Sequence, residues 1–284
     1  MKILTFDIEE WFHCDFVSGD FSWQKYEVRI HDGVDRILDS LQQQGTKATF
    51  FCLGWIAREY PEVIRKIHAM GHEIGSHSDV HELATRFDRN TFAEDTRRSV
   101  SSIEDVLGEK VRIYRAPAFS ITENNLWAFD ILAQNGIEYD CTVFPAAHDY
   151  GGFPSFGSGN VSIIRSENHS IREFPISPAN VMGRNLVYSG GGFFRLLPYW
   201  FIRKQFQKAD YVMTYFHPRE FDRRQPMLEH LPKMRKFKSY YGLDSAFSKF
   251  ESLMNEFTFD TVLSAAQKID WNNVPVVNIN PVNR

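Results

Sequence analysis

Residues 2–54 hold the first strand, helix and strand, and their order decides the fold. Residues 2–6, KILTF, are a short apolar run followed at once by acidic residues, which predicts a buried strand with polar side chains at its carboxyl end. Residues 32–44 have apolar side chains at helical spacing before Gly45, and residues 47–54, KATFFCLG, predict a second buried strand. This β-α-β order predicts parallel strands.

The same alternation continues along most of the chain. Helices are predicted at 61–70, 92–107, 124–135, 196–208 and 259–269, and strands at 72–77, 111–117 and 211–217. Strands alternating with helices imply a parallel sheet with helices outside it, in either a barrel or an open doubly wound sheet.

Between residues 144 and 192 the composition shifts to Gly, Ser, Pro and aromatic residues. Two alternating stretches, 161–166 and 170–177, predict a hairpin. We expect this region to be an irregular insertion at the rim of a site, within a single domain that spans 1–284.

Composition favours a partner that is a small molecule or a glycan. Apolar residues make up 43% of the chain, which supports a substantial core. The formal charge is -4 and no run of five or more like charges occurs, so we expect no nucleic acid or anionic membrane partner. These patterns do not determine the oligomeric state.

The start of the chain and its cysteines predict a soluble, cytoplasmic protein. An acidic residue is present by position 7, unlike the basic and then apolar pattern of a signal peptide. The longest apolar cluster, 191–202, is interrupted by Arg195 and Pro198, and it is shorter than the roughly 20 residues that span a bilayer. The three cysteines contain no C-x-x-C motif and fit free thiols; they are Cys14, Cys52 and Cys141.

Candidate metal ligands follow two of the predicted strands. Asp7 and Glu9 are two residues apart, so they face the same side of an extended chain. His77 and His81 are four residues apart and follow another strand. Two imidazoles and one carboxylate form the ligand set of a catalytic zinc site, which leaves a position for water.

Arg115 and His217 end two further predicted strands. In a parallel barrel all strand carboxyl ends open onto one face, so these side chains can meet the carboxylates and histidines of the earlier strands. Taken alone, Arg115 is explained equally well by a surface ion pair, and His217 by a hydrogen-bonded histidine at the end of a strand. Their joint placement favours a functional site.

Five ordered motifs cover most of the chain: TFDIEEWF at 5–12, SHSDVH at 76–81, RAPAFS at 115–120, WAFDILAQNGIEYDCTVFP at 127–145 and MTYFHPREFD at 213–222. Together they resemble the polysaccharide deacetylases of the NodB-homology group, the fourth carbohydrate esterase family. The segment SGGGFFRLLPYW at 189–200 resembles the branch associated with bacterial exopolysaccharide loci. The resemblance implies a distorted α/β barrel with about seven parallel strands.

The resemblance also implies roles for individual residues. Asp7 matches the general base of the family, Arg115 the residue that holds this base, and His217 the general acid. His77 and His81 match the metal ligands. The bound ion is expected to be one divalent metal, with zinc favoured and cobalt, nickel, manganese or iron as alternatives.

The acidic metal ligand departs from the commonest family motif. That motif has two adjacent aspartates, the second of which binds metal, but Ile8 occupies this place. Strand alternation returns Glu9 to the side of Asp7, so Glu9 is the expected ligand and Glu10 the alternative.

Four residues are candidates for substrate contacts. Trp11 and Phe119 lie next to motif residues in predicted strand-end loops, where aromatic rings can stack on a sugar. The backbone N–H of Ala118 can donate to an oxyanion. Gly191 belongs to a Gly-rich turn that is either a flexible link or a place where the substrate approaches the backbone closely.

We therefore expect a metal-dependent hydrolase that removes an N-acetyl group from an amino sugar or glycan precursor in polysaccharide or surface-glycan biosynthesis. One alternative is a hydrolase of a small non-sugar amide, such as a ureide or cyclic imide. The other is a catalytically inactive carbohydrate-binding protein, which the missing second aspartate favours.

Overall fold

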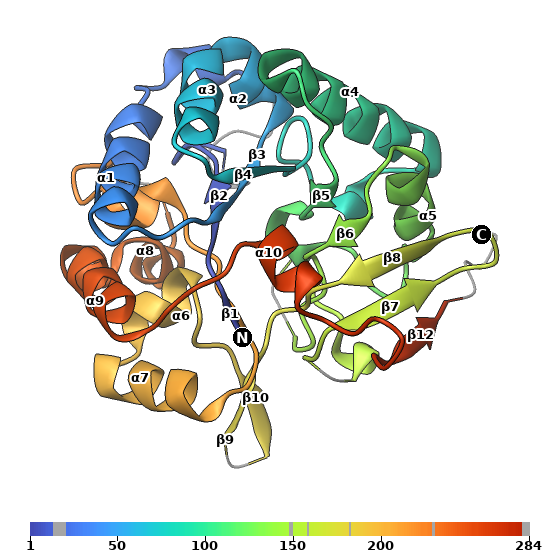
Figure 1. Cartoon of the computed structure of the whole chain (residues 1–284). Coiled ribbons are helices and arrows are strands. Elements are labelled where there is room, and N and C mark those ends of the chain that lie inside the picture. Colours follow the sequence, from blue (N-terminus) through green and yellow to red (C-terminus); the bar gives the residue numbers. More distant parts are fainter. Residues whose placement is uncertain (14–20, 148–149, 158, 182, 229–230, 280–284) are drawn as a thin grey trace.

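The computed structural model describes residues 1–13, 21–147, 150–157, 159–181, 183–228 and 231–279 (Figure 1). Its main sheet has the strand order β12-β7-β8-β6-β5-β4-β3-β2. The bounds in chain order are β2 Thr5–Ile8, β3 Thr49–Cys52, β4 Glu73–Ser76, β5 Ile113–Tyr114, β6 Tyr139–Asp140, β7 Ser162–Arg165, β8 Ser170–Glu173 and β12 Val276–Asn278. The strands from β2 to β6, and β8 beside β6, are all parallel to their neighbours.

A second small sheet curls this arrangement towards a barrel. The strand β1 (Lys2–Ile3) pairs in parallel with β11 (Val212–Met213), and Phe6 bridges Phe216 further along. On the other side, Tyr211 Oη donates to Pro175 O at 2.7 Å, just beyond β8. With β1 and β2 counted as one broken strand, seven parallel strands are present among the described residues, which confirms the predicted distorted barrel.

The helices lie around the outside of the strands (Figure 1). The bounds are α1 Ile30–Gln43, α2 Gly54–Glu59, α3 Pro61–Ala69, α4 Arg89–Leu107, α5 Trp127–Gln134, α6 Gly191–Leu196, α7 Tyr199–Lys208, α8 Lys233–Tyr240, α9 Leu243–Glu256 and α10 Val262–Gln267. Local signals set several ends: α4 begins with a capping box between Asp88 and Thr91 and stops at Gly108 in the left-handed conformation. Because helices cover the sheet, β2 and β3 are buried at every position.

The predicted hairpin is present, and one of its strands belongs to the barrel. The strands β7 and β8 pair antiparallel, as their alternating sequences predict. However, β8 also pairs in parallel with β6, so this part of 144–192 continues the central sheet and does not only border a site. A separate hairpin forms from β9 (Ala179–Val181) and β10 (Arg184–Leu186).

Other elements differ from the sequence predictions. The helix predicted at 196–208 begins only at Tyr199, as α7, because Pro198 forces extended backbone on Leu197. The separate helix α6 ends at Leu196 and was not predicted. The helices α8 and α9 and the strand β12 were not predicted. No helix among the described residues is long and apolar enough to cross a membrane.

Two of the three cysteines lie in the described part of the chain. Cys52 and Cys141 are buried free thiols, as predicted. Cys14 lies outside the described residues.

Candidate metal and acid–base site

Six residues predicted from strand ends come together at the carboxyl side of the barrel. Asp7 lies within β2 and Glu9 directly follows it, while the histidine loop follows β4, Arg115 follows β5 and His217 follows β11. Asp7, Glu9, His77 and Arg115 are each at most 5% exposed. The site is therefore an enclosed polar cluster within the apolar barrel.

Glu9, His77 and His81 form a group that can hold a metal ion. One ligand atom from each lies within 4.8 Å of the others. Glu9 Oε2 is buried and forms an ion pair with His81 Nε2. A buried carboxylate oxygen that faces imidazole nitrogens fits a cation held between these side chains.

The protonation states also suit metal ligation. Burial is the largest influence on His77 and lowers its pKa to about 4, so the ring is neutral at pH 7. Its Nδ1 lies 2.7 Å from Arg115 O, which orients the ring and leaves Nε2 for a metal. For Glu9, burial opposes ionisation, but the neighbouring imidazoles, above all that of His81, outweigh it and lower its pKa well below the usual range.

The loop that carries the two histidines is held in a strained conformation. Ser78 and His81 have φ values of 73° and 57°, which non-glycine residues adopt rarely and mainly at functional sites. Asp79 anchors the loop: its N–H donates to Asp95, and its carboxylate accepts from Arg58 at 3.0 Å. These anchoring residues were not predicted, because the sequence spacing does not show which helix packs behind the loop.

Asp7 is held by a buried ion pair with Arg115. Arg115 Nη1 lies 2.7 Å from Asp7 Oδ1 and 2.7 Å from Thr5 Oγ1, and its Nε donates to Cys141 O at 3.2 Å. The guanidinium also lies over the Phe51 ring, 4.2 Å from its centroid. These contacts fix the Asp7 carboxylate in one orientation.

His217 faces Asp7 Oδ2, whereas the Arg115 guanidinium holds Asp7 Oδ1. Its Nε2 is 3.7 Å from Asp7 Oδ2 and 3.9 Å from Glu9 Oε1, and its Nδ1 is 3.3 Å from Glu220 Oε2. Burial alone would lower the pKa of His217, but its hydrogen bond to Glu220 and the charges of Glu9, Glu220 and Asp7 raise it to about 9. His217 is therefore protonated at neutral pH.

Glu220 and Arg195 are site residues that the sequence analysis missed. Glu220 links His217 to Arg195, because its Oε2 contacts His217 and its Oε1 accepts a hydrogen bond from Arg195 Nε at 3.1 Å. The spacing of three residues between His217 and Glu220 is the signal that could have found the carboxylate. Nothing in the sequence pairs Arg195 with it.

Glu10, the alternative metal ligand, is occupied by contacts away from the two histidines. Glu10 Oε1 accepts from the backbone N–H groups of Arg29 at 2.7 Å and Ile30 at 2.8 Å. Glu10 therefore caps the start of α1. Glu9 is left as the carboxylate that faces His77 and His81.

The predicted substrate contacts have mixed outcomes. Trp11 is 5% exposed and its Nε1 donates to Glu27 O at 2.9 Å, so it packs in the core and does not form a sugar-binding wall. A Cβ on Gly191 would lie 2.8 Å from the Tyr215 ring, which gives this glycine a packing role. Ala118, with φ of 50°, lies in the turn just after Arg115, beside the buried Phe119.

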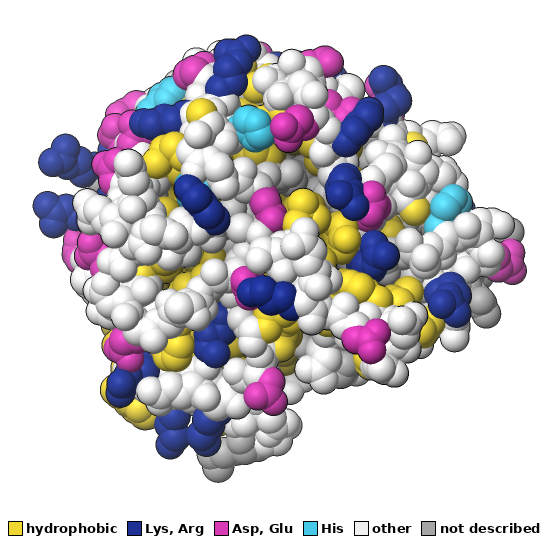
Figure 2. Space-filling model, in the orientation of Figure 1, with side chains coloured by type: hydrophobic (Ala, Val, Ile, Leu, Met, Phe, Trp, Pro, Cys, Tyr) yellow, Lys and Arg dark blue, Asp and Glu magenta, His cyan; other side chains and the backbone are white. Residues whose placement is uncertain are grey.

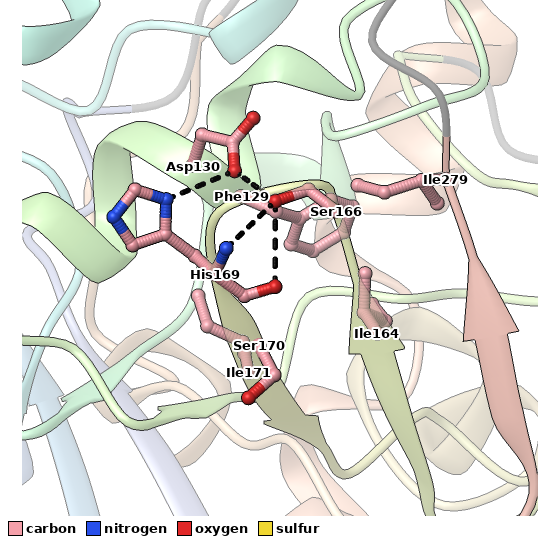
Figure 3. A pocket seen from close by; sticks show the side chains of 8 residues that line it. All are labelled: Phe129, Asp130, Ile164, Ser166, His169, Ser170, Ile171 and Ile279. Atoms are coloured by element: carbon pink, nitrogen blue, oxygen red, sulfur yellow. Dashed lines mark hydrogen bonds and ion pairs between the residues drawn. The ribbon is translucent and has the colours of Figure 1, made fainter.

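A shallow hollow elsewhere contains Ser, His and Asp but lacks catalytic geometry (Figure 3). His169 Nδ1 lies 3.3 Å from Asp130 Oδ1, as in a catalytic triad. Ser166 Oγ, however, donates to the same carboxylate and not to the imidazole. This cluster joins the β7–β8 turn to α5 and provides no activated nucleophile.

Comparison with known families assigns the N-terminal half of the chain. Residues 3–139, which include Asp7, both histidines and Arg115, match the family model described as polysaccharide deacetylase. This half of the chain belongs to the polysaccharide deacetylase family. Residues 141–267, which include His217 and Glu220, match a domain of unknown function, DUF3473.

Individual relatives agree with this assignment. A Bacillus cereus peptidoglycan-N-acetylglucosamine deacetylase is 30% identical over 117 residues, covering 39% of this chain and 42% of the relative. A Rhizobium leguminosarum bv. trifolii chitooligosaccharide deacetylase is 27% identical over 104 residues, 35% of this chain and 44% of the relative. The chain thus spans less than half the length of these curated relatives.

A solved Mycobacterium smegmatis structure that carries the name polysaccharide deacetylase has the same fold. Its TM-score is 0.67 at 19% identity, with 98% of this chain and 92% of that chain covered. The structural likeness includes the C-terminal half, so the shared fold extends over both matched regions.

Proposed function

We propose that this protein is a metal-dependent deacetylase that removes N-acetyl groups from an amino sugar in a glycan or glycan precursor. The observation that carries the proposal is the arrangement of Asp7 and His217 beside the group of Glu9, His77 and His81. A carboxylate base and a protonated imidazole beside a metal site are the groups that amide hydrolysis requires. The matched family and the named activities of its members support the same reaction.

Glu9, His77 and His81 would hold a divalent ion, with zinc favoured by the imidazole and carboxylate ligands. When bound, such an ion supplies Lewis-acid polarisation of water and of the amide carbonyl. Asp7, oriented by Arg115, accepts the proton of the attacking water. The backbone N–H of Ala118 donates to the developing oxyanion.

His217 completes the reaction by donating a proton to the leaving nitrogen. An amide cannot expel an unprotonated amine at neutral pH, so the acid must carry its proton before the C–N bond breaks. Glu220 Oε2 accepts a hydrogen bond from His217 Nδ1 and so keeps His217 Nε2 directed at the site. The products are acetate and a free amino sugar.

The wider setting is part of the proposal. The exopolysaccharide-type resemblance favours a role in polysaccharide or surface-glycan biosynthesis. The cytoplasmic location expected from the sequence remains a prediction. A catalytically inactive binding protein is disfavoured, because binding alone needs neither a held base nor a charged acid.

The test is acetate release from a panel of N-acetylated sugars that are free, nucleotide-linked or oligomeric. Metal-loaded wild type is compared with Asp7→Asn and His81→Ala. We expect release by wild type and loss in both variants. Metal binding with no release from any sugar would point to a non-sugar amide or to a binding protein.

A further inference from the structure

Most large apolar side chains that are exposed belong to one stretch of the chain. Among the described residues nine are exposed, and seven of these lie between 193 and 241: Phe193, Leu196, Trp200, Met227, Met234, Phe237 and Tyr241. Trp200 is 66% exposed and Met234 is 67% exposed. Exposed apolar side chains that gather in this way indicate an interaction surface.

The fold brings α6, α8 and the 226–228 segment together, and α7 follows α6 after two residues. Arg195 of α6 donates from Nη1 to Ser239 O at 3.1 Å and Tyr241 O at 2.8 Å, which joins α6 to the end of α8. Tyr240 Oη accepts from Leu228 N at 3.0 Å, so the segment with Met227 lies beside α8. We refer to these seven exposed apolar residues, which lie on α6, on α7, on α8 with the adjacent Tyr241, and in the 226–228 segment, as the rim surface.

The same stretch is strongly basic within an acidic protein. Residues 191–241 contain eleven Lys and Arg but four Asp and Glu, whereas the whole chain contains 32 and 36. The helices α7 and α8 hold seven Lys and Arg and no Asp or Glu. Figure 2 shows Lys and Arg side chains at the lower left of the molecule, where α7 lies in Figure 1. A search for runs of like charge misses this feature, because apolar residues separate the cations in the sequence.

We propose that the rim surface binds the surface of an anionic lipid bilayer. Apolar and aromatic side chains among Lys and Arg on short helices are typical of proteins that lie in the interface of a membrane. Exposed cations such as Lys204 and Lys233 would meet anionic headgroups, while Trp200, Met234 and Phe237 would enter the headgroup and acyl boundary. A soluble polyanion would satisfy the cations but leave these apolar side chains exposed to water.

The rim surface adjoins the acid side of the candidate active site. Arg195, which anchors α8, also contacts Glu220, and Glu220 contacts His217. The start of α6 is also fixed close to His217, because Gly191 N donates to the backbone oxygen of Tyr215 at 3.1 Å, two residues before His217. A bilayer bound here would bring a membrane-anchored glycan to the site; this consequence rests on the proposed function, whereas lipid binding does not.

Co-sedimentation with vesicles tests the proposal without any turnover. The full chain is mixed with vesicles of phosphatidylglycerol and phosphatidylcholine, or of phosphatidylcholine alone. We expect binding to the anionic vesicles only, weakened at high salt because surface charges are screened. The variant Trp200→Ser/Met234→Ser should reduce binding, and Lys204→Glu/Lys233→Glu should reduce it about tenfold or more.

Matched controls carry similar changes outside the rim surface. Val276→Ser alters another exposed apolar side chain and Arg65→Glu another exposed cation; both should bind as wild type does. Circular dichroism and thermal melts check that each variant is folded. No binding to anionic vesicles, equal losses in the controls, or binding to soluble polyglutamate or DNA but not to vesicles would overturn the proposal.

Discussion

Arg115 Nη1 lies 2.7 Å from Asp7 Oδ1, and both side chains are buried. Removal of one partner leaves an uncompensated buried charge, which costs about 3–5 kcal/mol. We expect Arg115→Met to lower the free energy of unfolding by this amount, as measured by urea denaturation at neutral pH. Arg112→Met is the control, because its pair with Glu138 is exposed and worth about 0–1 kcal/mol. Equal losses in the two variants would contradict a special role for the buried pair.

Glu220 should set the alkaline limit of activity through His217. The raised pKa, about 9 against an ordinary 6.5, means that the folded protein favours the protonated ring, and this preference is lost as the pH rises through about 9. Glu220→Gln keeps the shape but removes the charge, so the alkaline limb of kcat should move down towards 6.5. Glu256→Gln, which changes a surface carboxylate paired with Arg203, should leave the limb in place. If the alkaline limb of the pH profile of kcat stays in place in Glu220→Gln, a group other than His217 is the general acid.

Glu9 and Glu10 should give opposite results when each is changed. Glu9→Gln should lower the metal content after dialysis while the protein remains folded. Glu10→Ala should keep the metal but lose the cap of α1, at a cost of about 0.5–2 kcal/mol in unfolding free energy. Metal analysis and urea denaturation of both variants distinguish the two roles. Loss of metal in Glu10→Ala alone would reverse the assignment.

Gly190 is required by close packing against β11. A Cβ at this position would lie 1.9 Å from Tyr215 O, and backbone cannot move aside as a flexible side chain can. Gly190→Ala should therefore destabilise the fold by about 1–3 kcal/mol. At Gly192 the atoms nearest to an added Cβ are 3.6 Å away, so Gly192→Ala should leave the stability of the fold nearly unchanged. Thermal melts of the two variants measure the difference. Similar melting of both variants would show that the strand yields easily.

Sequence reasoning located the barrel and most of the site because both depend on strand ends. Asp7, His77, Arg115 and His217 each follow or end an apolar run, and parallel strands bring such positions to one face. It placed Trp11 wrongly, since a position in the sequence does not say which way a ring turns. It also missed the link from Arg195 to Glu220, because the partners are 25 residues apart on different elements.

The charge of the rim surface was missed for a related reason. The cations of α7 and α8 are separated from each other by 24 residues of β11 and the following loop, 209–232. The fold, and not the local sequence, decides that α6, the 226–228 segment and α8 lie together.

The central claim is that His217 protonates the leaving nitrogen while Asp7 activates water. The most direct measurement compares hydrolysis of an N-acetyl amino sugar with hydrolysis of an aryl acetate ester by metal-loaded wild type, His217→Ala and Asp7→Asn. An aryl oxide leaves without a proton, whereas an amine does not, so His217→Ala should lose amide hydrolysis by about 10²–10⁴-fold yet retain most ester hydrolysis. Asp7→Asn should lose both. Equal loss of ester and amide hydrolysis in His217→Ala, in a folded and metal-loaded protein, would contradict the assignment of His217 as the general acid.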